Sequence, residues 1–220
     1  RRLSVEAPGT YQHSLVVGSI AEAAANAIGA NGLFCRVSTL YHDIGKLFNP
    51  HYFTENQMGG FNIHQLLTPL ESTQVIISHV TEGEALARKN ALPQSFIDII
   101  REHHGTKLVY YFYAKQVEQM EGGVDQVDES LFRYPGPKPR SKESAIIMMA
   151  DTVEAASRSA NDLNNEGLLE MIERLIGEKL KDGQFRECEL SFKEFEIVKS
   201  TIIKTLSVAR HLRIKYPTIK

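Results

Sequence analysis

The dipeptide His42-Asp43 constrains the fold of this chain more than any other sequence feature. An imidazole can hold one cation, while the two oxygens of the neighbouring carboxylate can bridge two. The pair alone is a weak indication of a metal site. Further candidate ligands lie far from it along the chain, at separations that packed helices can bring together, and these make the indication strong. The seven candidate metal ligands are His13, His42, Asp43, His79, His103, His104 and Asp151.

The N-terminal part of the chain carries signals for two helices. Thr10 is expected to cap a first helix, whose apolar residues recur at helical spacing as far as Gly29. Asn31 is expected to cap a second helix that leads to the His-Asp pair and stops at Gly45. A long loop is predicted from Phe48 to Leu67, beside this pair.

Capping boxes mark helices farther along the chain. Thr68 and Glu71 form the first, with proline at the first helical position, and residues 81–84 repeat the pattern for a short following helix. Ser191 and Glu194 form a third, which is expected to start a helix to about residue 212.

The central part of the chain alternates helix with irregular structure. Pro93 is expected to open a helix that carries His103 on its apolar face and His104 about 100° round from it. Residues 107–120 continue as an aromatic helix, residues 133–139 are too rich in proline to be helical, and Ser141 caps the helix that carries Asp151. With a further helix over residues 168–180, no internal repeat and no run of alternating strands, the chain is predicted to be an all-α bundle.

Length and composition indicate one domain. A chain of 220 residues, 42% of them hydrophobic, can bury one substantial core. We expect residues 1–220 to form a single domain, with a core over about 6–158 and C-terminal helices over about 164–212. A net charge of −2 argues against long nucleic acid as a partner. Cys35 and Cys188 form no CxxC motif, which favours a reducing compartment.

No run of about 18 apolar residues occurs, so the chain is expected neither to span a bilayer nor to carry a signal peptide. Because it begins with Arg1-Arg2 rather than Met, we expect it to be a fragment of a longer protein.

The candidate ligands suit a pair of transition-metal ions. Histidine nitrogens with a few carboxylates favour iron, manganese, zinc, cobalt or nickel over magnesium or calcium. Seven ligands are too many for one tetrahedral zinc, and they fit two ions that share Asp43. The two predicted groups are His13, His42, Asp43 and Asp151, and Asp43, His79, His103 and His104. Two such ions can activate a bridging water and hold a phosphate oxygen, so phosphoester hydrolysis is the natural reaction.

In its order of histidine, His-Asp, histidine, His-His and a late aspartate, the chain resembles the HD-domain superfamily of metal-dependent phosphohydrolases. More narrowly, it is similar to the cytoplasmic HD domain of the seven-transmembrane HD phosphodiesterases, which cleave cyclic di-AMP to linear pApA. The segments that carry this resemblance are His42-Asp43-Ile44-Gly45-Lys46, Tyr134-Pro135-Gly136-Pro137-Lys138-Pro139 and residues 6–14, 77–80 and 103–106. The similarity runs from about residue 6 to 158 and is weaker beyond.

The resemblance implies an HD-domain helical bundle around a binuclear site with iron or manganese. It implies that the seven residues are the ligands, that Asp43 bridges the two metals, that a hydroxide between the ions attacks phosphorus, and that Lys46 lies at the scissile phosphate. Asp43 and Lys46 are therefore the predicted catalytic residues. Residues 105–108, Gly-Thr-Lys-Leu, replace the Gly-Tyr-Pro signature of the related cyclic di-GMP enzymes, which counts against that substrate.

Other residues are candidates for contact with the nucleotide. Glu55, Asn56 and His64 lie in the predicted loop and either reach the substrate or order the loop. Lys138, like Arg140, either faces the anionic ligand or keeps a proline-rich loop soluble. The aromatic run over residues 110–113 could stack on adenine, although such a run is more often core. The predicted substrate contacts are Lys46, Asn56, His64 and Lys138.

The expected partner is cyclic di-AMP, and a homodimer is left open. The resemblance places the full-length protein at the cytoplasmic face of the cell membrane, which it would reach only through regions outside this chain, while the fragment itself is expected to be soluble. Three rivals remain: an HD phosphohydrolase for another nucleotide, an HD-type di-iron oxygenase, and a silent nucleotide-binding domain. A silent nucleotide-binding domain would be expected to have lost some of the metal ligands, and all seven candidates are present in this sequence.

Overall fold

The computed structural model describes residues 1–57, 62–160 and 165–211, and every regular element in these ranges is a helix. The α-helices are α1 Arg2–Glu6, α2 Pro8–Ala27, α3 Gly32–Ser38, α4 Pro69–Lys89, α5 Gln94–Glu102, α6 Tyr110–Gln119, α7 Lys142–Ser159, α8 Asn165–Lys181 and α9 Phe192–His211. The 3₁₀ segments are η1 Ile44–Phe48, η2 Pro50–Tyr52, η3 Thr54–Asn56, η4 Ile63–Leu66, η5 Gly123–Gln126 and η6 Glu129–Phe132. The prediction of an all-α chain is confirmed.

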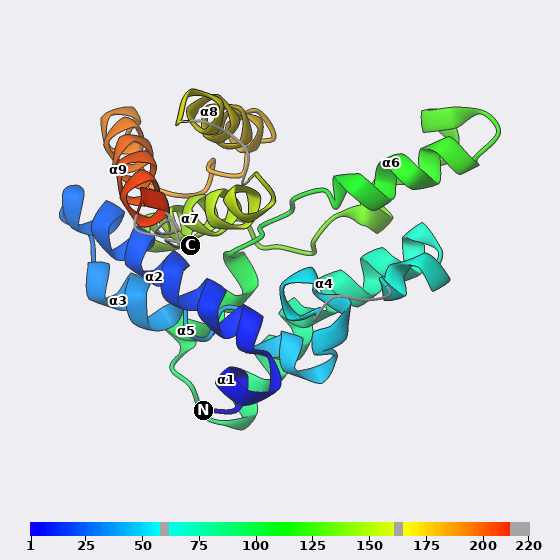
Figure 1. Cartoon of the computed structure of the whole chain (residues 1–220), viewed down its shortest axis with the longest axis horizontal. Helices are drawn as coiled ribbons and strands as arrows, with labels where there is room; N and C mark the ends of the chain where they lie inside the picture. The colour runs from blue at the N-terminus through cyan, green and yellow to red at the C-terminus, as the bar shows by residue number, and fades with distance from the viewer. Residues whose placement is uncertain (58–61, 161–164, 212–220) are drawn as a thin grey trace, which may run out of the picture.

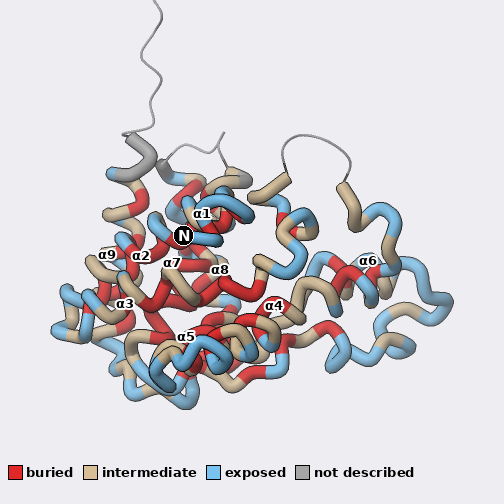
Figure 2. The backbone as a smooth tube through the Cα atoms, turned by 90° about the horizontal axis from the view of Figure 1, so that it is seen from below, coloured by how far each residue is buried: buried red, intermediate tan, exposed pale blue. Residues whose placement is uncertain are grey.

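The main core lies where α2 and α7 pack together, with α3, α8 and α9 around them (Figure 1). Helix α2 presents Ala21, Ala24 and Ala25, all fully buried, and such small side chains let a neighbouring helix approach closely. The buried stretches in Figure 2 gather in this region. In both views α6 and the segment after it project to one side, away from α2 and α7.

Helix α2 begins at Pro8, so the prediction that Thr10 caps it was wrong. Proline is favoured at the first helical position because its missing N–H would have no partner there. The N-terminal end of the helix is capped instead from a loop distant in sequence, since the amide oxygen of Asn56 accepts a hydrogen bond of 3.1 Å from the backbone N–H of Thr10. The loop over 48–57 is thereby fixed to α2.

The second predicted helix is shorter than expected. Asn31 caps α3 as predicted, by accepting a hydrogen bond from the backbone N–H of Phe34. The helix ends at Ser38, however, and a turn followed by η1 carries the His-Asp pair. Gly45 is not a helix stop, because it lies inside η1. A Cβ atom there would be 1.8 Å from the carbonyl oxygen of His79, so glycine is required by the close approach of η1 to α4.

Two of the three predicted capping boxes start helices. Thr68 caps α4 in a complete box with Glu71, and Ser191 exchanges hydrogen bonds with Glu194 at the start of α9. The box predicted over residues 81–84 was wrong, because α4 runs without a break to Lys89. Thr81 lies inside that helix and donates to the carbonyl of Ser78 at 3.0 Å.

The centre of the chain differs from the prediction at two helix ends. Helix α5 ends at Glu102, so the doublet that follows lies just beyond it rather than on its face. Helix α6 begins at Tyr110 instead of Lys107, because the 107–109 backbone bonds to the segment over 132–134, with 2.8 Å from the Val109 nitrogen to the Phe132 oxygen. Ser141 caps α7 as predicted, and residues 133–140 are not helical.

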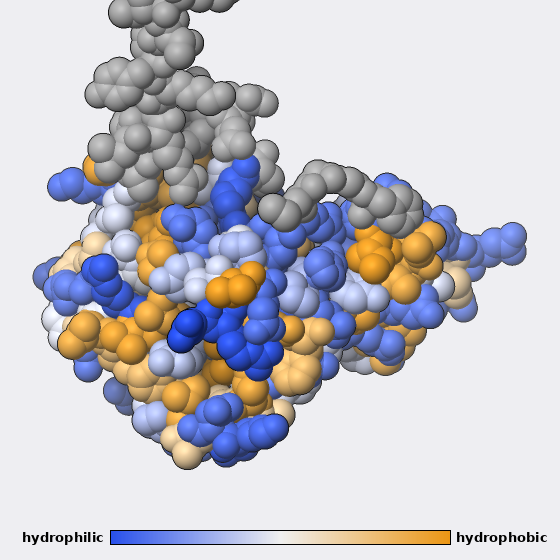
Figure 3. Space-filling model, turned by 60° about the horizontal axis from the view of Figure 1, so that its bottom comes forward, coloured by the Kyte–Doolittle hydropathy of each residue, from blue (hydrophilic) through white to orange (hydrophobic). Residues whose placement is uncertain are grey.

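Two earlier expectations fall partly outside the described residues, namely the Gly59-Gly60 part of the loop and the end of the last helix at residue 212. In the part of the chain that the structure describes, no helix is both long and apolar enough to cross a bilayer. On the face shown in Figure 3, apolar side chains lie in separate groups among polar ones.

Candidate metal centre

All seven predicted ligands meet in the interior, although they come from five segments of the chain. They are supplied by α2, the turn after α3, α4, the end of α5 and α7. Six are buried, and the side chain of His104 is 14% exposed. Two groups have ligand atoms within 4.8 Å of one another; one is Asp43, His79, His103 and His104, and the other is His13, His42 and Asp151.

Asp43 lies between the two groups and presents one carboxylate oxygen to each. Its Oδ1 is 3.3 Å from Nε2 of His79 and 3.6 Å from Nε2 of His103. Its Oδ2 is 3.2 Å from Nε2 of His42 and 3.8 Å from Nε2 of His13. A carboxylate in this position can bind two cations at once.

Asp151 closes the other side of the cluster. Its Oδ1 is 2.9 Å from Nε2 of His13 and 3.7 Å from Nε2 of His42. Its Oδ2 faces Nδ1 of His104 at 3.8 Å. The two aspartates therefore bracket the histidines from opposite sides.

Backbone carbonyls orient three of the rings. Nδ1 of each ring donates to the carbonyl three residues earlier, at 2.6 Å for His42, 2.5 Å for His79 and 2.8 Å for His103. The proton is thereby held on Nδ1, and the lone pair of Nε2 is left to point into the cluster.

The Nε2 lone pairs of these three histidines have too few hydrogen-bond donors around them, and a bound cation would satisfy them. Nε2 of His79 lies 3.3 Å from Nε2 of His103, and with both Nδ1 protons used on carbonyls neither nitrogen of this pair has a proton to donate. Within the described residues, Nε2 of His42 and Oδ1 of Asp43 are buried without a hydrogen-bond partner. Buried acceptors without donors are costly, and a shared divalent cation would satisfy them.

The protonation states of the histidines favour metal binding in both ligand groups. Burial, only partly opposed by Asp43, lowers the pKa of His79 to about 3, and burial likewise keeps the pKa of His104 well below its usual range. Both are neutral ligands at neutral pH. Although burial acts to lower it, the carboxylates of Asp43 and Asp151 raise the pKa of His42 to about 10, so these carboxylates favour a positive charge at Nε2 of His42, as a bound cation would supply. The nitrogen-rich donor set fits divalent transition metals.

Glu154 supports the cluster from α7, although no role for it was predicted from the sequence. It accepts a short hydrogen bond from Nδ1 of His13, whose Nε2 faces Asp151. Such a carboxylate fixes the ring of a metal-binding histidine and raises its basicity. Arg158 in turn places Nε 3.1 Å from Glu154. The signal was the three-residue spacing after Asp151, which puts Glu154 on the same helix face.

Lys46 lies at the edge of the cluster. Its Nζ is 2.8 Å from Oδ2 of Asp43 and 2.7 Å from Glu55, and it stands 4.8 Å from the ring centroid of Phe53. Burial would lower the pKa of this lysine, but the two carboxylates raise it above its usual value. Lys46 is therefore a permanent positive charge beside Asp43.

The other predicted substrate contacts lie outside the ligand groups. Both amide atoms of Asn56 bond to Thr10, and Nε2 of His64 bonds to the carbonyl of Tyr52 at 2.8 Å, so both order the loop. Lys138 lies on the extended segment before α7, and its charge acts on Asp182.

The aromatic run of α6 is mostly not core. Tyr110 and Tyr111 are exposed, whereas Phe112 is buried. The side chain that stacks at the cluster is Tyr134, whose ring centroid is 4.3 Å from that of His104. Tyr134 belongs to the proline-containing segment that carried the resemblance, yet sequence reasoning did not single it out.

Comparisons with known proteins identify the relatives of this chain. Residues 10–156 match the family model described as HD domain. The chain is 48% identical over 217 residues to the cyclic-di-AMP phosphodiesterase PgpH of Bacillus subtilis, covering 99% of this chain and 30% of that protein. It is 45% identical over 220 residues to the PgpH of Listeria monocytogenes, covering 100% of this chain and 30% of that protein.

A solved structure is similar over nearly the whole chain. The HD domain of L. monocytogenes PgpH, crystallised in complex with cyclic-di-AMP, superposes with a TM-score of 0.91 at 45% identity, covering 94% of this chain and 95% of that one. The chain thus spans about 30% of the length of the curated relatives.

Proposed function

The chain belongs to the HD domain family, and from this premise we propose that it is a metal-dependent phosphodiesterase domain that hydrolyses cyclic di-AMP to linear pApA. The observation that carries the proposal is the position of Asp43, with one oxygen toward each of two histidine groups. The choice of substrate rests on similarity to a domain whose crystal structure contains cyclic-di-AMP.

We propose that two ions, iron or manganese, occupy this cluster. His13, His42 and Asp151 would hold one ion, His79, His103 and His104 the other, and Asp43 would bridge them. Two such ions lower the pKa of a bound water and neutralise charge that develops on a phosphate.

Lys46 would act directly on the reacting phosphate. An ammonium group has three N–H donors, and Asp43 and Glu55 occupy two. The third is available for a phosphate oxygen, where a fixed positive charge stabilises the additional negative charge of the transition state. Because the two phosphodiester bonds of the ring are equivalent, one cut gives pApA.

The other predicted substrate contacts are proposed to act either directly on the substrate or through the loop beside it. Lys138 is kept as a candidate contact for the anionic substrate. Asn56, which bonds to Thr10 of α2, and His64, which bonds to the carbonyl of Tyr52, would act on the nucleotide through the loop that they order.

We propose that the chain is the cytoplasmic part of a longer membrane protein. The support is that curated relatives extend well beyond it, since it covers 30% of their length. A homodimer is also proposed, and light scattering of the purified chain would test it.

The test of function is incubation of the chain, reconstituted with Mn²⁺ under anaerobic conditions, with cyclic di-AMP and cyclic di-GMP in parallel. We expect pApA to form much faster than the guanine product. Asp43→Ala should lose hydrolysis together with bound metal, whereas Lys46→Met should lower turnover and keep its metal content.

Other results would redirect the assignment. If two metals bind and neither dinucleotide is cut, the substrate proposal fails. Hydrolysis of another nucleotide would then favour a different HD phosphohydrolase, and oxygen uptake with an organic substrate would favour an HD-type di-iron oxygenase.

A further inference from the structure

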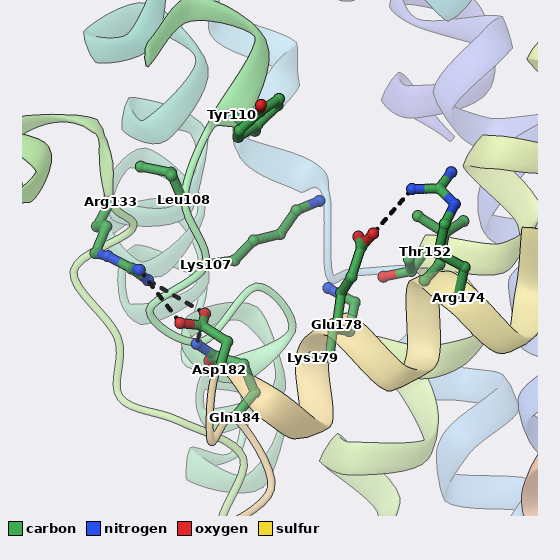
Figure 4. Close-up of a pocket in the computed structure, with 11 residues that line it drawn as sticks. Lys107, Leu108, Tyr110, Arg133, Thr152, Arg174, Glu178, Lys179, Asp182 and Gln184 are labelled. Carbon is green, nitrogen blue, oxygen red and sulfur yellow. Dashed lines mark hydrogen bonds and ion pairs between the residues drawn. The ribbon is translucent and has the colours of Figure 1, made fainter. Parts of the chain in front are cut away.

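A cavity of about 660 Å³ lies between α7, α8 and the 107–108 segment (Figure 4). This size is in the range that holds a small organic ligand. We call it the lysine cavity, and the residues that line it are Lys107, Leu108, Tyr110, Arg133, Thr152, Arg174, Leu175, Glu178, Lys179, Asp182 and Gln184.

Two of its four cations have partners and two do not. Arg133 pairs with Asp182 at 3.2 Å, and Arg174 pairs with Glu178 at 2.9 Å, as the dashed lines in Figure 4 show. Within the described part of the chain, the ammonium groups of Lys107 and Lys179 make neither an ion pair nor a hydrogen bond. The carboxylates of Glu178 and Asp182 act on Lys179 only from a distance, so neither lysine has an anion in direct contact.

Lys179 is unusual because it is only 6% exposed. A buried ammonium group without a partner is unfavourable unless something compensates its charge. Burial, together with the neighbouring charge of Lys107, lowers the pKa of Lys179 to about 7. An anion in the cavity would offset both effects.

The cavity adjoins the metal centre. Thr152, which lines it, directly follows Asp151 in α7. The charge of Asp151 acts on Lys179, and the charge of Lys107 acts on His104, so the two lysines stand within electrostatic range of both ligand groups. A ligand with two anionic groups could therefore engage the cluster and the cavity together.

We propose that Lys107 and Lys179 bind the second, non-reacting phosphate of the cyclic dinucleotide while the first lies at the metal cluster. This inference rests on the function proposed above and adds a specificity site to it. It predicts that a substrate with two phosphates is preferred over a mononucleotide, because only the former can place a second anion in the lysine cavity. A charge-assisted hydrogen bond of this kind changes affinity by about tenfold or more.

The experiment compares ligands with one and two phosphates. Binding of pApA and of AMP to the metal-loaded chain is measured by calorimetry for the wild type and for Lys179→Met, which keeps the length of the side chain and removes its charge. We expect the variant to bind pApA about tenfold more weakly and AMP unchanged, and KM for cyclic di-AMP to rise by a similar factor with kcat little altered. Lys107→Met should act in the same direction.

Lys181→Met is the matched control, because it removes a positive charge from the exposed end of α8, outside the cavity lining. It should change neither affinity. Equal weakening of pApA and AMP in Lys179→Met, or no weakening of either, would overturn the inference. If the wild type cleaves cyclic di-AMP and the variant keeps its KM, the cavity inference alone fails; if the wild type does not cleave it, both proposals fall together.

Discussion

Single residues orient the side chains of the cluster, and Glu154 is the clearest case. It supplies the carboxylate that orients His13 from behind. We expect Glu154→Gln to keep the fold and to weaken metal binding about tenfold, because outer carboxylates of this kind typically change metal affinity by 10- to 100-fold. Metal titration of the purified variant measures this. Glu170→Gln, on the exposed face of α8, is the control and should bind metal like the wild type.

A second prediction for a single residue concerns Lys179 and the pH dependence of the free energy of unfolding. Its pKa is about 7 in the folded chain, below the ordinary lysine value of 10.5. Between these two values the unfolded chain binds more protons, so this group makes stability rise with pH. The two pKa values differ by about 3.5, and one pKa unit corresponds to about 1.4 kcal/mol, so Lys179→Met should gain roughly 5 kcal/mol below pH 7 in phosphate-free buffer.

That gain should shrink toward zero as the pH approaches 10.5, where the lysine is neutral in both states. Thermal unfolding of wild type and variant at several pH values measures the difference. An advantage that stays constant across the range would mean that packing, rather than charge, causes it.

The seven members of the cluster could be predicted from sequence, but the residues that support them could not. Histidines and aspartates in a fixed order carry their chemistry in their residue type, whatever surrounds them. Lys179 has no such signature, because only the packing of α8 beside the 107–108 segment buries it. Tyr134 is similar, since its contact with His104 depends on the path of a non-helical segment.

At the scale of elements, the contact between η1 and α4 sets the geometry of the cluster. It brings Asp43, which precedes η1, to His79 of α4. Gly45→Ala would put a Cβ atom 1.8 Å from the His79 carbonyl, so the two elements must move apart. We expect loss of metal binding even where the helical content, measured by circular dichroism, is kept.

Gly177→Ala is the matched control for that substitution. Gly177 lies within α8, and a Cβ atom there meets nothing within 4 Å. Alanine in a helix interior is favoured over glycine by about 0.5–1 kcal/mol. This variant should bind metal normally and unfold at a slightly higher temperature. Normal metal content in Gly45→Ala would show that η1 and α4 are not tightly coupled.

Helix starts were more predictable than helix ends. Thr68 and Ser191 start helices because each caps backbone N–H groups that have no other partner. The same residue types over 81–84 have no such effect, because the preceding turns of α4 already provide partners. The end of α3 at Ser38 depends on tertiary contacts of the following turn, which local sequence does not report.

For the whole molecule, metal should join elements that otherwise pack through separate contacts. Ligands come from α2, α4 and α7 and from the ends of α3 and α5. A ligand at 100–1,000 times its Kd adds about 3–4 kcal/mol to the native state. At roughly 2–4 °C per kcal/mol for a chain of this size, metal should raise Tm by about 5–15 °C.

Differential scanning calorimetry with Mn²⁺ and then with a chelator measures this shift and its reversal. Asp43→Ala serves as the control, because the bridging carboxylate is gone. A similar rise in Tm for Asp43→Ala would place the stabilising ion elsewhere on the chain.

The distance along the chain between ligands also sets an order of events in time. His13 and Asp151 meet in the cluster, yet they are 138 residues apart. At about 5–20 residues per second, roughly 7–28 s of synthesis separate the two on the ribosome. Metal cannot template the first half of this domain as it emerges. The proposed binuclear centre can be complete only after α7 has left the exit tunnel, when most of the helices that enclose the cluster already exist.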